Sequence, residues 1–101
     1  DIQIIGLTID ETKTRAGELF YTKLFSFMQL NSMNFKFMIR ILELPSINRN
    51  TQIQVYAQDT NLLTFNTMPD EDYLESLVKE TIEALFAYQK QKEILDKNFN
   101  Y

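Results

Sequence analysis

Cysteine, histidine and tryptophan are all absent from the 101 residues of this chain. Without thiols or imidazoles, the chain cannot use a cysteine nucleophile, a thiolate zinc site, a histidine metal ligand or a histidine general base. The lack of cysteine also leaves the redox compartment open. Only two glycines occur, Gly6 and Gly17, and this excludes a glycine-rich phosphate-binding loop.

Long apolar runs are missing as well. No stretch approaches the roughly 18 residues of a membrane-spanning helix, and we expect a protein that is not embedded in a membrane. No signal-peptide pattern is present. This says nothing about export, because processing removes such segments. A formal net charge of −4 argues against a nucleic-acid partner, which would need clustered Lys and Arg. The negative excess falls in residues 69–101, where a solvated helix face is the simplest interpretation.

The composition that remains is that of a globular protein, with 45% hydrophobic and 13% aromatic residues. This length and composition predict one domain with a single core. We expect an N-terminal arm over residues 1–9, one α+β domain over 10–95 and a C-terminal tail over 96–101. The first seven residues, apolar and β-branched, are typical of an edge strand, of an arm that docks on a neighbour or of a terminus that packs on its own domain.

Residues 10 to about 28 have the pattern of an amphipathic helix. Thr8 and Glu11 are spaced as in a capping box, and Asp10 offers a further capping oxygen. Gly17 falls inside this helix, where glycine costs about 1 kcal/mol relative to alanine. Either another backbone or an aromatic ring comes close there, or the glycine is simply exposed. The expected apolar face consists of Ala16, Phe20, Leu24, Phe27 and Met28.

Three segments alternate between apolar and polar residues, which is typical of half-buried strands. They span residues 34–43, 52–58 and 62–67. A loop rich in Pro, Ser and Asn and a tight polar turn connect them. Such short connections predict an antiparallel meander.

A second amphipathic helix is predicted from Pro69 to beyond Tyr88, fraying in the residues that follow. Thr67 and Asp70 form another capping box, and Pro69 suits the first turn of a helix. The acidic run at residues 70–72 is better explained by the helix dipole than by a calcium site, because the spaced-ligand loop is missing. The apolar stripe comprises Leu74, Leu77, Val78, Ile82, Leu85 and Phe86.

These elements predict an α+β fold in the order α-β-β-β-α, a three-stranded antiparallel meander with two helices packed on one face. The other face of the sheet is then uncovered and amphipathic, and it is either a contact surface or simply exposed to solvent.

No arrangement of carboxylates or nucleophiles favours an enzyme, and a carboxylate hydrolase would require a cleft. The expected core includes Phe20, Leu24, Phe37, Ile39, Val55, Phe65, Val78 and Ile82.

Residues at characteristic spacing occur along most of the chain. They are Gly6, Leu7, Asp10, Thr12, Thr14, Gly17, Phe20, Tyr21, Phe25, Ile41, Glu43, Pro45, Ser46, Arg49, Ile53, Val55 and Pro69. Together they resemble the curli assembly and secretion accessory factor family, CsgE, with this chain as a divergent member. Ile5 stands where family members have a proline, and residues 50–52 stand where several members carry tryptophan.

The resemblance implies a non-enzymatic adaptor without cofactors in the periplasm of a Gram-negative bacterium. Such proteins bind a curlin-like amyloid subunit and delay its fibre formation. They also cap the periplasmic side of the outer-membrane curli secretion pore as a homo-oligomeric ring, ninefold if like the family. A structural subunit of another cell-envelope assembly, without a chaperone role, is the alternative. The candidate protein-binding residues are Met38, Arg40, Gln54, Tyr56, Arg49 and Glu43.

Overall fold

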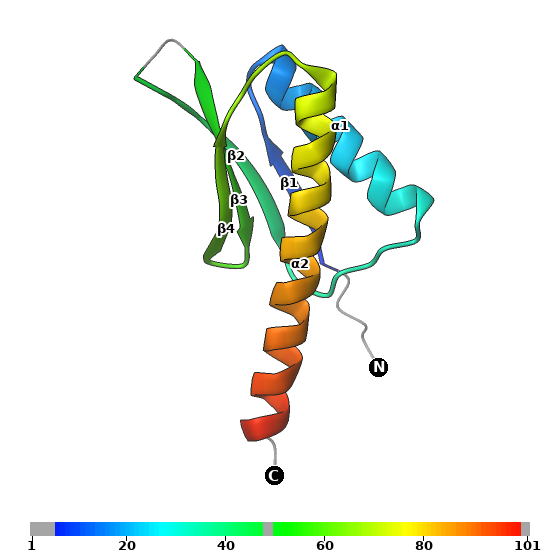
Figure 1. The fold of residues 1–101 in the computed structure, drawn as a ribbon. Helices are drawn as coiled ribbons and strands as arrows, with labels where there is room; N and C mark the ends of the chain where they lie inside the picture. Colours follow the sequence, from blue (N-terminus) through cyan, green and yellow to red (C-terminus); the bar gives the residue numbers. More distant parts are fainter. Residues whose placement is uncertain (1–5, 48–49, 100–101) are drawn as a thin grey trace.

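The computed structural model describes residues 6–47 and 50–99, and these residues form the predicted α+β fold (Figure 1). The sheet has four strands, however, and not three. The strands are β1 (Thr8–Glu11), β2 (Ile39–Pro45), β3 (Thr51–Ala57) and β4 (Thr60–Asn66), and the helices are α1 (Arg15–Leu30) and α2 (Glu71–Phe99). The spatial order of the strands is β1-β2-β3-β4.

The additional strand, β1, overturns the predicted start of the first helix. Thr8 to Glu11 pair in parallel with Ile39 to Leu42 of β2, and the Ile39 N–H donates to the carbonyl of Leu7 at 2.8 Å. The backbone groups of these residues therefore form hydrogen bonds with β2 in a sheet, and not within a helical turn. The capping box expected at Thr8 and Glu11 is wrong, because Thr14 is the actual N-cap of α1 and its side chain accepts the Gly17 N–H at 3.1 Å.

The predicted meander is confirmed, since β2, β3 and β4 pair antiparallel in sequence order. The predicted strand over residues 34–43 begins late, at Ile39. Phe35 and Phe37 are buried as expected, but they precede the strand, and the Phe35 carbonyl accepts the Gly6 N–H at 3.1 Å.

Both helices cover the same face of the sheet, as the sequence predicts (Figure 1). Side chains on one face of β2 and β3, such as Ile41 and Val55, are fully buried, whereas their neighbours Leu42 and Gln54 on the opposite face are only half-buried. Seven of the eight expected core residues are buried. The eighth, Phe65, is half-buried because it lies on the outermost strand, where it packs edge-on against Phe20 with ring centroids 5.0 Å apart.

The apolar stripes of the helices differ from prediction at single positions. In α1, Gly17 is buried with Phe20, Leu24 and Met28, whereas Phe27 is 39% exposed. In α2, Phe86 is 46% exposed, and the polar Thr81 is fully buried in the stripe. The Thr81 hydroxyl donates to the Leu77 carbonyl at 2.7 Å, and this bond satisfies the group without another partner.

Helix α2 begins one turn away from the predicted capping box. Asp70 caps it, accepting the Tyr73 N–H on Oδ1 at 3.2 Å, while Thr67 is buried against β3. The acidic residues Glu71 and Asp72 then fill the first turn, where the helix dipole favours them. The helix does not fray near residue 90 but continues to Phe99, and its last part extends beyond the sheet (Figure 1).

Candidate interaction surfaces and a buried carboxylate

Glu43 is the one acidic side chain among the described residues that is buried. It is fully buried on β2, and its carboxylate meets the turn between β1 and α1. Oε1 accepts the backbone N–H groups of Lys13 at 2.5 Å and Thr14 at 2.9 Å, and Oε2 accepts the Thr14 hydroxyl at 2.5 Å and the Thr51 hydroxyl. The carboxylate therefore joins the start of α1 to β2 and β3.

Gly17 supplies the space for this carboxylate. A Cβ placed on Gly17 would collide with Oε1 of Glu43 and lie 2.8 Å from its Cδ. The neighbour of this glycine is thus a carboxylate, and neither a backbone nor an aromatic ring as the sequence suggested. Thr14, Gly17 and Glu43, which the sequence placed among its characteristic residues without relating them, form one cluster.

The electrostatics of the cluster favour an ionised Glu43. Burial raises the pKa of this carboxyl, but the hydrogen bonds from the Thr14 and Thr51 hydroxyls and from the Lys13 and Thr14 N–H groups bring the pKa below its usual value. The start of α1 also places the positive end of a helix dipole beside the group. Glu43 is therefore a charged clamp at neutral pH.

Two threonines extend the cluster to the end of β4. The hydroxyls of Thr51 and Thr67 are 2.7 Å apart, and the Thr67 hydroxyl also reaches the Thr51 carbonyl at 3.1 Å. Sequence reasoning missed Thr51 and Thr67 as cluster members. A signal was available, because Glu43 occupies an inward position of an alternating strand and so requires buried partners.

The uncovered face of the sheet holds three of the six predicted contact residues. Arg40 and Tyr56 lie directly opposite each other on β2 and β3, and Gln54 is two residues along on β3. The Tyr56 hydroxyl donates to the Gln54 side-chain carbonyl at 2.9 Å. Arg40 forms an ion pair with Glu11 of β1. All four side chains are partly accessible, and they form a row across three strands.

The remaining predicted contact residues occupy different places. Met38 is half-buried just before β2, and its carbonyl accepts the Gln58 N–H at 2.8 Å. Glu43 faces the helices and is not accessible from the uncovered face. Arg49 lies outside the described residues. The structure thus brings together Arg40, Gln54 and Tyr56, with Met38 at the end of the row.

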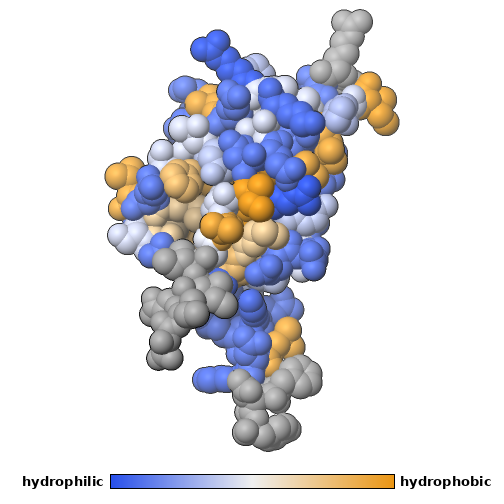
Figure 2. All heavy atoms as spheres, turned by 180° about the vertical axis from the view of Figure 1, so that it is seen from behind, coloured by the Kyte–Doolittle hydropathy of each residue, from blue (hydrophilic) through white to orange (hydrophobic). Residues whose placement is uncertain are grey.

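Exposed apolar side chains occur on several elements of the described chain, including β1, α1 and α2. Seen from behind, the molecule shows hydrophobic residues in several separate places on a mainly hydrophilic surface (Figure 2). Among the described residues, the most exposed large hydrophobic side chains are those of Leu7, Leu30 and Ile47.

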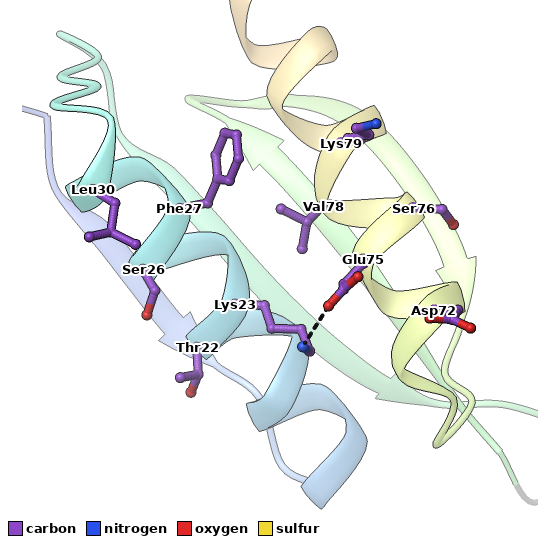
Figure 3. A pocket seen from close by; sticks show the side chains of 10 residues that line it. All are labelled: Thr22, Lys23, Ser26, Phe27, Leu30, Asp72, Glu75, Ser76, Val78 and Lys79. Atoms are coloured by element: carbon purple, nitrogen blue, oxygen red, sulfur yellow. Dashed lines mark hydrogen bonds and ion pairs between the residues drawn. The ribbon is translucent and has the colours of Figure 1, made fainter.

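A groove of about 610 Å³ separates α1 from α2 (Figure 3). Phe27 and Val78 face each other across it, which explains why Phe27 is not in the core. Lys23 of α1 bridges to Glu75 of α2 at 3.3 Å and links the two walls. With four charged side chains on its walls and an exposed ion pair, the groove resembles ordinary surface more than a ligand site.

Within residues 6–47 and 50–99, no three acidic residues come together in the way that a metal ion requires. No described helix combines the length and the apolar character needed to cross a bilayer.

The fold and its surfaces define a small α+β protein with one helix-covered and one open sheet face, held at the start of α1 by a buried carboxylate. The model of the family described as Curli assembly protein CsgE matches residues 4–100. The chain therefore belongs to this family, as the sequence resemblance indicates, and it has a role in curli assembly. No curated protein and no solved structure matched the chain.

Proposed function

We propose that this protein is a non-enzymatic periplasmic adaptor for curli secretion in a Gram-negative bacterium. It binds curlin-like amyloid subunits, delays their fibre formation and, as a homo-oligomeric ring, caps the periplasmic side of the outer-membrane secretion pore. Membership of the curli assembly family over almost the whole chain supports this role.

The observation that carries the proposal is the open face of the sheet. Arg40, Gln54 and Tyr56 present a cation, an amide and an aromatic ring on adjacent strands, with Met38 beside them. Such a mixed row makes many modest contacts rather than one strong one. An adaptor needs this kind of surface, because its unfolded client must later be released. We retain Arg49 as a further proposed contact, and we assign Glu43 the role of holding the fold under this surface.

The proposal is tested by following the growth of curlin fibres with thioflavin fluorescence. The wild-type protein is expected to delay growth at substoichiometric to equal concentrations. The double variant Met38→Glu, Tyr56→Glu should lose most of this delay while melting within a few degrees of wild type, because both side chains lie outside the core. Light scattering of the same samples reports whether assembly changes as well.

A charge-matched control is available on the exposed side of α2. The double variant Ala87→Glu, Gln91→Glu adds the same charge away from the sheet and should delay fibres as the wild type does. If the sheet variant assembles and delays fibres normally, the contact surface lies elsewhere. A wild-type protein without any effect on fibre growth would favour a structural subunit of a cell-envelope assembly instead.

A further inference from the structure

The two edges of the sheet differ in how they are protected against pairing with another strand. The β1 edge is four residues long and carries Asp10 and Glu11. The β4 edge is seven residues long, Thr60 to Asn66, and contains no charged residue and no proline. Charges, prolines and short length are the usual devices that keep edge strands from pairing. The β4 edge lacks all three.

Hydrogen bonding defines which backbone groups of β4 are open. The Thr67 N–H donates to the Thr51 carbonyl at 2.9 Å, and bonded pairs alternate along antiparallel strands. Phe65 and Leu63 therefore bond to their partners Ile53 and Val55 in β3, and the N–H and C=O groups of Thr64 point away from the sheet. Since β4 is the last strand in the sheet order, no described strand pairs with these groups.

Local features limit the open stretch at both ends. The register shifts between Val55 and Tyr56, leaving Leu62 without a paired residue, and such a bulge interrupts ladder formation. At the other end, the Tyr73 hydroxyl donates to the Asn66 carbonyl at 2.7 Å. By the same alternation the Asn66 carbonyl also points outward, but it already accepts this hydrogen bond from Tyr73 and is not open to another strand. The remaining site consists of the Thr64 N–H and C=O and the Asn66 N–H.

We propose that this open stretch of β4 accepts an extended, uncharged segment of the curlin-like client as an added strand. Main-chain hydrogen bonds recognise extended backbone irrespective of sequence, which suits an unfolded client. Because the edge carries no charge, it can accept a neutral segment, whereas a charged segment would find no oppositely charged side chain there. Only about three backbone groups are offered, so pairing is weak and the client is released easily. This inference rests on the proposed function, since it adds a backbone contact for the client at the sheet edge, next to the open face.

The direct test is amide hydrogen exchange, residue by residue, with and without a freshly unfolded curlin subunit. In the free protein, the Thr64 amide should exchange at least tenfold faster than those of Leu63 and Phe65. Added curlin should slow the exchange of Thr64 at least tenfold, while exposed amides on α2 remain unchanged. If the wild type delays fibres but Thr64 exchange does not change, the edge is not the client site and only this inference fails.

Two other outcomes also overturn the inference. Slower Thr64 exchange at higher protein concentration without curlin would show that a second copy occupies the edge. If the wild type neither delays fibres nor shows protection of Thr64 by curlin, the proposed function and the inference are both rejected.

Variants at Thr64 give an independent measurement. Thr64→Pro removes an outward N–H that β3 does not use, and Thr64→Lys adds a charge to the exposed edge. Both should shorten the fibre delay at least fivefold. Gln91→Lys on α2 adds the same charge elsewhere and should leave the delay unchanged. If Thr64→Pro fails to fold, Thr64→Lys decides; a normal delay with this variant contradicts the proposal.

Discussion

Glu43 shows how one buried charge can organise a small core. Its carboxylate accepts hydrogen bonds from two backbone N–H groups at the start of α1 and from the hydroxyls of Thr14 and Thr51. A buried ion without such partners would cost several kcal/mol, so the threonines and the glycine beside it are parts of one arrangement. The sequence interpretation counted Glu43 among the contact residues, and it did not indicate which residues would receive its charge.

The pairing of Gly17 with Glu43 can be tested with a double-mutant cycle. Gly17→Ala alone should destabilise the protein by about 1–3 kcal/mol, because overpacking against the carboxylate exceeds the gain in helix propensity of about 1 kcal/mol. In a Glu43→Ala background, the same change should be neutral or stabilising by up to about 1 kcal/mol. Urea unfolding measures both values. Ser26→Ala, on the exposed part of α1, controls for propensity alone; a stabilising Gly17→Ala in the wild type would contradict the clash.

The pH dependence of stability follows from the same carboxylate. The pKa of Glu43 is lower in the folded than in the unfolded state, so its ionised form contributes stability above the unfolded value of about 4.3, and this stability is lost as the pH falls through the folded pKa. Glu43→Gln should therefore cost about 1–3 kcal/mol at pH 7 and progressively less below pH 4. Denaturant unfolding at several pH values tests this. A cost that stays constant down to pH 3 contradicts the assignment, and Glu83→Gln on α2 is the control.

At the scale of elements, the two helix starts show the same kind of error in prediction. In both cases a Thr–acid pair with capping-box spacing stands before the helix, and in both cases the cap lies at a later residue. Thr14 and Asp70 cap the helices, because Thr8 is committed to pairing with β2 and Thr67 to hydrogen bonds with Thr51. Sheet pairing thus competes with capping for the same residues.

The cap of α2 gives an element-scale prediction. Asp70→Ala should destabilise the protein by about 1 kcal/mol, since the Tyr73 N–H loses its acceptor. Asp72→Ala removes an exposed charge in the first turn but no cap, and it should cost only about 0.3–1 kcal/mol through the helix dipole. Thermal unfolding distinguishes the two variants. Equal costs would show that charge near the helix start, and not the cap, is what matters.

At the scale of the whole molecule, α2 defines the long dimension. The protein measures 51 × 29 × 22 Å, and the 29 residues of α2 span roughly 43 Å at 1.5 Å per residue. The ring of Tyr88 packs edge-on against Phe37 with centroids 4.9 Å apart. Beyond Tyr88, most described side chains of α2 are exposed, including Ile94 and Leu95.

This uneven packing predicts uneven stability along α2. Amides at residues 91–97 should exchange with deuterium at least tenfold faster than those at 77–85, because a helical segment of this length is marginal without tertiary contacts. Exchange measured by NMR at low protein concentration tests the gradient. Uniform protection along the helix would mean that another molecule covers its end.

The sequence alone predicted the two helices, the three-stranded meander and the parity of burial along β2 and β3, because these follow from periodic patterns within a few residues. It also carried the spaced residues that resemble the curli assembly family, and the family match over residues 4–100 agrees with them. The parallel pairing of β1 with β2, the late start of α1 and the place of Gly17 depended on the tertiary structure. Each involves residues about thirty positions apart, such as Lys13 and Glu43. Local periodicity contains no information about such contacts, because the donors that bind a buried carboxylate come from segments that only folding brings together.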